Sequence, residues 1–482
     1  SEDETPTIGW ASPTQCNGAW LPFFDWTLTY YEAKATPAEK PALADAIAAA
    51  GGKTLGFEDG EYAPYNNVDA LTKLAAAMAI NPETASGEAV VAATTALTGA
   101  DWTANVGEVN AIAYGNLSTY ETVDSKDYPY GWSKLNDGSR IMGGSEGTNN
   151  TGLSASSTGK AMLLKYNATY GETTGYTLPL KAGKIYKITF KYCGWGNNPT
   201  TNIVLTDPES NTISLAPGFR PATNDGYSNA EHWYEYTGYF VSTKAGNYVL
   251  AMNKVESGQQ QIAWADIKLV SASELEFADG SVPTYAPGTY PSVKITRSLT
   301  ADRWATAVYP FAVSGVDNIA VLDSYDKTTG ALVFTSAAAS TANVPFFMMS
   351  NTDKSEITLS DVAVAAANAT PATASEASLK GAYTATNITG AEDNYVLSNN
   401  QIFSVGDAGA TINPYRAYIQ IAANSSVKVL SFIVDGTAKG VEAPEVTEAE
   451  EEEILYNTAG VRVGKDYKGI VINQKGEKFL NK

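Results

Sequence analysis

Short runs of strand-forming residues recur along residues 101–272, and this recurrence constrains the fold more than any other feature of the sequence. Each run alternates apolar and polar residues, and a turn signal follows after about 8 to 12 positions. The peptides LKAGK, TDPES and TKAGN place Gly, Pro, Asp or Asn where the chain must reverse. Strands this short bury their apolar faces only when one sheet packs on another, so the spacing predicts a β-sandwich.

Three other segments are also rich in strand formers. Residues 1–35 carry many aromatic residues and predict either irregular structure or strands, which could be the first of the sandwich. Residues 276–440 repeat the pattern of short strands and predict a second β-sandwich-like domain. Residues 441–482 open with the acidic peptide EAPEVTEAEEEE, whose like charges favour an extended linker, and end in alternating runs that predict a short β segment.

Residues 36–100 differ from the rest because they contain Ala-rich runs that begin with helix-capping residues and end near glycine. Thr36 followed by Glu39 is a helix-start signature, in which each residue caps a backbone amide near the other. The candidate caps of the three runs are Thr36, Asn67 and Asn81. The segment therefore predicts a small insert of three α-helices in a chain that is otherwise mainly β.

The charge of the chain excludes two classes of partner. The formal net charge is −20, and no cluster of Lys and Arg interrupts it. Phosphate backbones and anionic membrane surfaces attract clustered cations, so neither nucleic acid nor a charged membrane surface is an expected partner. No run of 18 apolar residues occurs, which predicts that the chain has no transmembrane segment.

Histidine and cysteine are scarce. His232 is the one histidine, which excludes zinc sites with several imidazoles and makes catalytic triads and most His-based acid/base chemistry unavailable. Cys16 and Cys193 are the only cysteines and could form at most one disulfide. Two cysteines fit a reducing or an oxidising compartment equally, so the sequence leaves both the pairing and the compartment open.

An enzyme needs a catalytic constellation, and the densest acidic cluster near aromatic residues is Glu58, Asp59 and Glu61. A carboxylate pair could hydrolyse a glycosidic bond. The alternative is an ordinary loop between helices, and no nucleotide-binding, nucleophile-elbow or HExxH motif supports catalysis elsewhere. The surrounding peptide GFEDGEYAPYNN could also close over a ligand face if the helical insert packs on the sandwich.

Two peptides of the sandwich region resemble a known family. YTLPLKAGKIYKITFKYCGWG is similar to a strand pair of the β-jelly-roll carbohydrate-binding modules that are attached to bacterial glycoside hydrolases. HWYEYTGYFVSTKAGNYVLAMNK, followed by IAWADIKLV, resembles their closing strands. The resemblance implies a jelly-roll sandwich over residues 101–272 that binds a polysaccharide or other glycan. Such modules often hold a structural calcium ion, and the resemblance places Asp266 at one ligand position.

The remaining β segments resemble parts of exported proteins. ITRSLTADRWATAVYPFAVSG, VPFFMMSN and INPYRAYIQI are similar to β-domains near the C-termini of exported proteins of gut and oral Bacteroidetes. The last residues, YNTAGVRVGKDYKGIVINQKGEKFLNK, resemble a C-terminal segment that in some relatives is a sorting signal. These resemblances imply a secreted or outer-surface protein, with a host or cell-surface protein as a further candidate partner.

A tryptophan between two glycines marks the candidate ligand site. Trp195 stands at the end of a predicted strand, where an exposed indole could stack on the apolar face of a pyranose ring. Amide, carboxylate and guanidinium groups nearby would bond the sugar hydroxyls. The candidates, from two loops that could converge, are Asn197, Asn198, Arg220, Asn224, Asp225, Tyr227 and His232. The alternative is that Trp195 anchors a loop, whereas Trp132, Trp233 and Trp264 fall inside alternating runs and are expected in the core.

These observations favour non-catalytic glycan binding by the jelly roll. An alternative is a structural or adhesive surface protein whose β-domains act only as scaffold. A glycoside hydrolase is the least favoured reading, because no catalytic site is recognisable.

Overall fold

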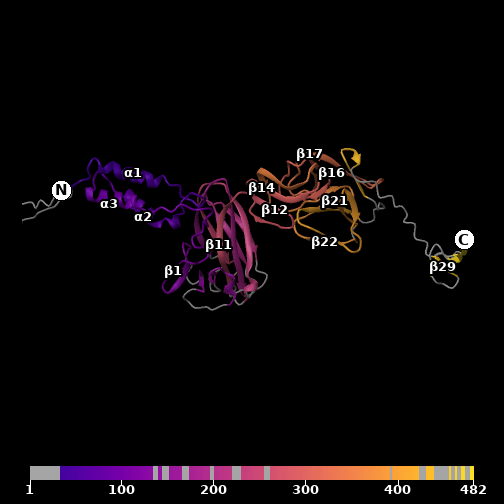
Figure 1. The fold of residues 1–482 in the computed structure, drawn as a ribbon, viewed down its shortest axis with the longest axis horizontal. Coiled ribbons are helices and arrows are strands. Elements are labelled where there is room, and N and C mark those ends of the chain that lie inside the picture. Colours follow the sequence, from indigo (N-terminus) through magenta and orange to yellow (C-terminus); the bar gives the residue numbers. More distant parts are fainter. Residues whose placement is uncertain are drawn as a thin grey trace, which may run out of the picture. The chain divides into compact units, whose positions relative to one another are not determined.

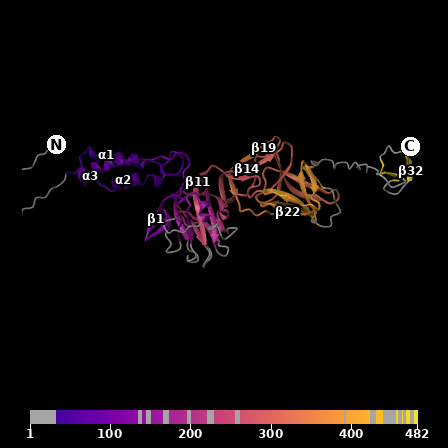
Figure 2. The same cartoon turned by 60° about the horizontal axis from the view of Figure 1, so that its bottom comes forward.

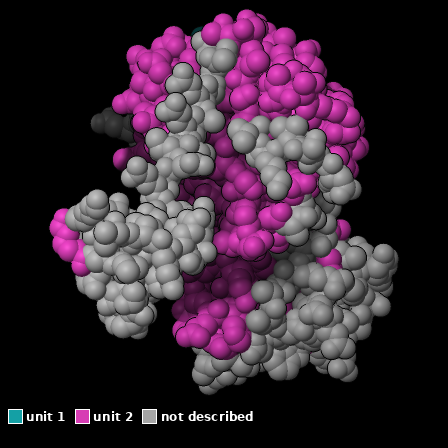
Figure 3. All heavy atoms as spheres, turned by 90° about the vertical axis from the view of Figure 1, so that its right-hand side faces the viewer, with its two compact units in different colours: residues 1–55, 64–104 teal, residues 56–63, 105–482 magenta. Residues whose placement is uncertain are grey.

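The computed structural model describes residues 33–133, 139–143, 151–164, 173–195, 200–219, 229–254, 261–390, 393–422, 430–438, 455–457, 462–463, 468–472 and 478–481. Strands dominate it and three α-helices lie near its start, so the expected mainly β fold with a small helical insert is confirmed (Figure 1). The chain divides into two compact units, residues 1–55 with 64–104 and residues 56–63 with 105–482. Figure 3 shows a face of the second unit, in magenta.

The first unit is built from three helices with a core of small residues. They are α1 (Glu39–Gly51), α2 (Val68–Met78) and α3 (Gly87–Thr98). Leu43, Val90 and Leu97 are buried between them beside several alanines. Small side chains allow the helices to approach closely, which is why the Ala-rich runs of the sequence form this unit.

The helix ends agree only partly with the expected caps. Thr36 and Glu39 form the reciprocal capping box, because the Thr36 amide donates to Glu39 Oε2 at 2.7 Å and the Glu39 amide donates to Thr36 Oγ1 at 3.3 Å. Asn67 precedes α2, but its side chain bonds the backbone of Thr103 instead. Asn81 caps no helix, since it closes a turn and Ser86 caps α3.

The sandwich consists of a four-stranded antiparallel sheet and a six-stranded sheet that is antiparallel except for one short parallel strand at its edge. The six-stranded sheet has the order β13 (Thr284–Tyr285), β9 (Tyr234–Ser242), β6 (Lys184–Trp195), β11 (Gln261–Ala272), β4 (Ala161–Leu164) and β3 (Ser139–Met142). The four-stranded sheet has the order β5 (Thr173–Leu180), β10 (Gly246–Lys254), β7 (Thr201–Thr206) and β8 (Thr212–Phe219). A hairpin of β1 (Tyr120–Val123) and β2 (Lys126–Pro129) precedes them.

Alternation along each strand separates core from surface. In β10, Tyr248, Leu250 and Met252 are fully buried whereas Val249 between them is exposed. The Trp264 side chain in β11 is also fully buried, as expected, and Trp132 is buried beside Tyr176. The apolar members of the alternating runs therefore fill the space between the two sheets.

The second β body packs several sheets around aromatic clusters. One sheet joins β12 (Leu275–Ala278), β14 (Gly288–Leu299) and β19 (Lys354–Val364), and Figure 2 shows β14 beside β19. A second has the order β15 (Ala305–Ala307), β18 (Phe346–Met349), β16 (Asn318–Asp326), β17 (Ala331–Ala337), β27 (Ser431–Val434) and β28 (Thr437–Ala438). A third has the order β20 (Ala372–Ala374), β21 (Ala377–Ala382), β26 (Arg416–Ile421), β23 (Asn394–Ser398) and β24 (Gln401–Ser404), beside the pair β22 (Thr386–Ile388) and β25 (Ala410–Ile412).

Edge-to-face and stacked rings dominate the core of this body. The rings of Phe277 and Phe311 lie 4.9 Å apart, and those of Phe334 and Phe347 lie 4.2 Å apart. The end of the chain forms its own four-stranded sheet of β29 (Leu455–Asn457), β30 (Arg462–Val463), β31 (Gly469–Ile472) and β32 (Lys478–Asn481). A second sandwich-like body and a C-terminal β segment were both expected.

Two neighbouring residues of β10 test the assignment of its faces. We predict that Leu250→Ala lowers the free energy of unfolding by about 2 to 5 kcal/mol, because it leaves a cavity between the sheets. Val249→Ala, on the outer face, should cost less than about 1 kcal/mol. Native-state hydrogen exchange of β5 and β10 peptides measures both changes. Equal effects of the two substitutions would show that the faces are assigned wrongly.

Candidate functional site

The strands before and after the predicted site loops stop or begin at the same end of the sandwich. In the six-stranded sheet, Trp195 at the end of β6 pairs with Gln261 at the start of β11. Tyr192 pairs with Tyr234, the first residue of β9, and the 3₁₀ helix Ala230–His232 comes directly before it. The backbone of Trp195 and the residue His232 therefore belong to the same end of this sheet.

The four-stranded sheet contributes strand ends to the same place. Thr201 at the start of β7 pairs with Phe219 at the end of β8 and with Lys254 at the end of β10. Successive strands of the two sheets, β4 and β5, β6 and β7, β8 and β9, and β10 and β11, stop and begin again here. The topology thus brings together the ends of the two segments that the sequence analysis expected to converge.

Most of the predicted side chains lie outside the described residues. These are Asn197, Asn198, Arg220, Asn224, Asp225 and Tyr227, and for Trp195 the structure describes the backbone only. His232 is half-buried at the end of its 3₁₀ helix. The roles assigned to these eight residues stay predictions.

Aromatic side chains that the sequence analysis did not assign to the site lie at this end. The rings of Tyr192 and Tyr234 are 5.9 Å apart on neighbouring strands, and both are half-buried. Burial and the nearby Tyr234 raise the pKa of the Tyr192 hydroxyl above its ordinary value, so it stays a neutral donor near neutral pH. Their positions in the sequence could have identified them, because each tyrosine is the terminal member of a series of alternate, inward-facing residues in its strand.

Trp233 was expected inside a strand, and this expectation is wrong. It lies between the 3₁₀ helix and β9, where it packs partly buried against the outer face of the six-stranded sheet. The apolar residues it contacts belong to a cluster that includes Leu153, Cys193 and Ala263. Cys193 is fully buried there, and burial raises the pKa of its thiol, which makes it a packing residue. Cys16 lies outside the described residues.

A short segment covers part of that outer face. The 3₁₀ helix Thr151–Ala155 places Leu153 on the cluster, and Lys191 Nζ donates to the Ala155 carbonyl at 2.7 Å. Asp266 accepts from the Ser157 amide at 3.0 Å and from its hydroxyl. The half of the face around β4 and the end of β6 is therefore occupied by the chain itself.

These contacts give Asp266 a role as an anchor. Its carboxylate lies 3.5 Å from the Lys191 ammonium, at a β-bulge where its own φ is +51°. A neighbouring ammonium fits an anchoring ion pair better than a calcium site, since both cations need the same oxygens. Within the described ranges no group of three or more His, Cys, Asp or Glu side chains could hold a metal ion. Calcium binding by Asp266 stays a prediction.

The outer face of the four-stranded sheet carries small side chains. Alternation places on this face the exposed Thr177 of β5 and Val249 of β10, and the half-buried Ala251 of β10 and Val204 and Thr206 of β7. No aromatic residue occurs on this face among the residues described. A pyranose ring would find nothing to stack on there.

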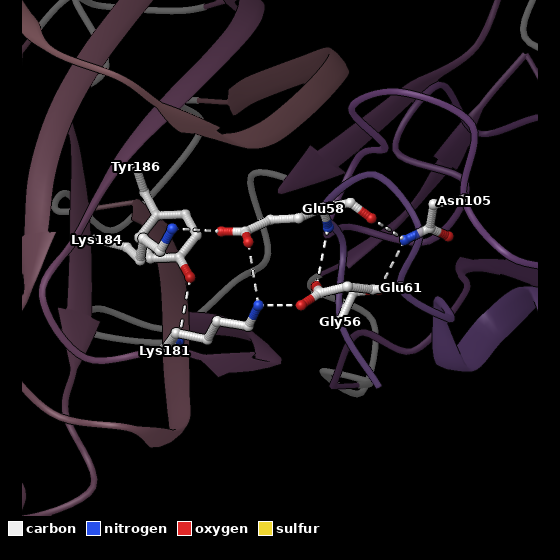
Figure 4. Close-up of polar contacts among 7 residues, drawn as sticks. All are labelled: Gly56, Glu58, Glu61, Asn105, Lys181, Lys184 and Tyr186. Atoms are coloured by element: carbon white, nitrogen blue, oxygen red, sulfur yellow. Dashed lines mark hydrogen bonds and ion pairs between the residues drawn. The ribbon is translucent and has the colours of Figure 1, made fainter. Parts of the chain in front are cut away.

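The acidic cluster lies at the opposite end of the sandwich. Glu58 accepts from Lys184 at 3.0 Å and from Lys181 at 3.2 Å, and Glu61 contacts the same Lys181 (Figure 4). Lys184 begins β6 and Trp195 ends it, so about 35 Å of strand separates the two places. Glu58 therefore lies far from the strand end at Trp195, and the hypothesis that its peptide closes over a ligand face gains no support at that end.

The same cluster fixes a loop to the sandwich. The Glu58 amide donates to Glu61 Oε2 at 3.1 Å, and Asn105 Nδ2 donates to the Gly56 and Glu58 carbonyls at 3.0 and 2.9 Å (Figure 4). A Cβ at position 56 would lie 1.9 Å from Glu61 Oε2, so any larger residue in place of Gly56 would displace this carboxylate. Asp59 accepts from the Gly107 amide at 2.7 Å. All three carboxylates thus form contacts that fix this loop in place, which argues against a catalytic pair.

The pH dependence of stability tests this anchor. The hydrogen bond from Lys184 lowers the pKa of Glu58 below its ordinary value, against an opposing effect of burial. A lowered folded-state pKa stabilises above the unfolded pKa of 4.5, and this contribution disappears as the pH falls through the folded value. We predict that Glu58→Gln lowers the melting temperature at pH 7 and has no such effect near pH 3.

The control is Glu356→Gln, which removes a mostly exposed carboxylate that pairs with Lys294. Thermal unfolding of the three proteins between pH 3 and pH 7 measures the difference. A Glu58→Gln effect that is the same at both pH values would contradict the anchor.

No protein-family model matches the sequence, and no curated protein matches it. A CBM61 module, solved in complex with β-1,4-galactotriose, is 13% identical with a TM-score of 0.25, covering 34% of this chain and 100% of that one. A putative sugar-binding protein from Bacteroides thetaiotaomicron is 12% identical with a TM-score of 0.22, covering 34% and 100%. A cyclase from Fischerella sp. is 13% identical with a TM-score of 0.20, covering 30% and 87%.

Similarities of this size say nothing about what this chain binds or whether it catalyses a reaction. The helices of the described part of the chain include none with the length and apolarity to span a lipid bilayer.

Proposed function

We propose that the sandwich binds a glycan without catalysis, at the end where β6 stops and β9 and β11 begin. The observation that carries the proposal is the convergence of strand ends there. The backbone of Trp195, the half-buried pair Tyr192 and Tyr234, and His232 all belong to this end. Aromatic rings beside polar loop residues are what a sugar site requires.

The rest of the sandwich surface supports this choice of place. The outer face of the four-stranded sheet lacks described aromatic residues, and the segment around Leu153 covers part of the other outer face. Of these surfaces, the strand ends are therefore the best-supported place for aromatic rings to stack on a sugar.

The absence of catalysis is part of the proposal and rests on the acidic residues. Glu58 and Glu61 are held by lysine, and Asp266 is held by Ser157 and Lys191. Binding a sugar by stacking and hydrogen bonds needs no acid or base. A secreted or outer-surface location, which the C-terminal resemblance implies, would give this site access to polysaccharides and to host or cell-surface partners.

A glycan-array screen tests the proposal. We predict that the wild-type chain binds at least one polysaccharide and that Trp195→Ala weakens binding at least about tenfold, the change that 1.4 kcal/mol produces. The matched control is Trp102→Ala in the helical unit, where the Trp102 ring lies under Lys53. It should leave glycan binding unchanged. Screens with and without Ca²⁺ test Asp266 in the same experiment.

Two results would contradict the proposal. Loss of binding in both tryptophan variants would show that Trp195 has no specific role. No glycan binding by a folded wild-type chain would favour the alternative of a structural or adhesive scaffold, with the aromatic end as a protein contact.

A further inference from the structure

A cleft of about 400 Å³ opens in the second β body, far along the chain from the proposed glycan end. It lies between the end of β14 with the start of β15 on one side and β23, β25 and β26 on the other. This volume falls in the range of about 300 to 1,000 Å³ that is usual for small-molecule sites. It is large enough to be a binding site.

Three of the chain's six arginines line this one cleft, although the chain as a whole is strongly acidic. They are Arg297, Arg303 and Arg416. Arg297 comes from β14, Arg303 from the turn after it and Arg416 from the start of β26. Tertiary structure therefore gathers positive charge from positions more than a hundred residues apart in the sequence.

Arg297 is a buried cation that forms no ion pair with a carboxylate of the described residues. It is 4% exposed, because alternation in β14 places it on the same face as Val293 and Ile295, at a β-bulge. Its Nη1 donates to the Thr306 carbonyl at 2.8 Å and its side chain hydrogen-bonds to Tyr309, while Asp279 attracts it without an ion pair because that carboxylate binds Arg416. Burial lowers its pKa, yet a guanidinium keeps its charge near neutral pH. A buried cation that shares its one acidic neighbour, Asp279, with a second arginine is only partly compensated, and a bound anion would add to that compensation.

The guanidinium of Arg416 can donate a further hydrogen bond. Its Nη2 donates to both carboxylate oxygens of Asp279, at 2.9 and 2.7 Å. Its Nε is buried and has no hydrogen-bond partner among the described residues. A buried N–H without a partner is uncommon in folded proteins and often indicates a missing ligand or water. Asp279 neutralises one arginine, so the cleft keeps a positive balance.

Two turns that border the cleft are tied together by hydrogen bonds. Asn400 Nδ2 donates to the Asp302 carbonyl at 3.0 Å, and the Trp304 amide donates to Asn400 Oδ1 at 2.7 Å. The Arg303 side chain donates to Asn399 Oδ1 across the same gap. These bonds tie the turn after β14 to the turn between β23 and β24. A site ordered in advance loses less entropy when it binds a ligand.

The remaining polar lining is neutral and suits hydroxyl groups. Its side chains are hydroxyls and amides, and include Ser298, Thr300, Ser398, Asn399, Thr411 and Asn413. Such groups both donate and accept hydrogen bonds, as a polyol requires. The paired N–H groups of the arginine guanidiniums in the cleft match the two oxygens of a carboxylate.

We propose that this cleft binds the carboxylate of an acidic monosaccharide unit, a uronate, with Arg297 and Arg416 on the carboxylate and the neutral lining on the hydroxyls. The site is separate from the glycan end of the sandwich, and neither proposal depends on the other.

Isothermal titration calorimetry with glucuronate and glucose tests the proposal, because the two sugars differ only in carboxylate against hydroxymethyl. We expect glucuronate to bind at least tenfold more tightly than glucose, with less affinity at high salt. Arg297→Gln should weaken glucuronate binding at least tenfold. Lys327→Gln removes the same charge from the surface of the same body, outside the cleft, and should change nothing.

Arg303→Gln provides a second variant, because Arg303 is exposed and its loss should not unfold the body. It should weaken binding several-fold even if Arg297→Gln fails to fold. Trp195→Ala should keep glucuronate binding, which separates this site from the proposed glycan site. Equal affinity for glucuronate and glucose, no binding of either, or acetate and sulfate binding as tightly as glucuronate would each overturn the proposal.

Discussion

Strand β6 is the element on which the sandwich depends. It pairs with β9 on one side and β11 on the other, and its alternate residues Ile188 and Phe190 are buried in the core. The strand begins at the lysines that fasten the acidic loop and ends at Trp195. Because a paired strand of this length is stiff, it holds the anchored end and the proposed binding end apart. The ion pairs that anchor the loop of Glu58 lie at one end of the strand, and the proposed binding residues belong to the other.

Charged side chains form local ion pairs in a chain that is acidic overall. Glu58 and Glu61 meet lysines at the start of β6, and Asp266 meets Lys191. These pairs fasten loops, so the carboxylates that looked most reactive in the sequence are structural. The arginines of the second body act differently, since Arg297 is buried, forms no ion pair among the described residues and shares the attraction of Asp279 with Arg416. Such an excess of buried positive charge favours a bound anion.

Local patterns predicted much of the fold. Alternation with turn signals predicted the strands of the sandwich, and Thr36 with Glu39 predicted the start of α1, because both depend on neighbours within a few residues. Asn81 and Trp233 were misassigned for a related reason. A turn and a 3₁₀ helix compete for the same residues that favour caps and strands, and only the surrounding packing decides between them.

The sequence by itself determined the mainly β class, the helical insert and the exclusion of histidine chemistry, since these follow from local periodicity and composition. Tertiary structure alone decided which residues meet. It placed the loop of Glu58 at the far end of β6 from Trp195, and it brought Arg297 beside Arg416 across more than a hundred residues. Strand order and register determine these contacts. Both arise from packing between distant segments, so no short stretch of sequence predicts them.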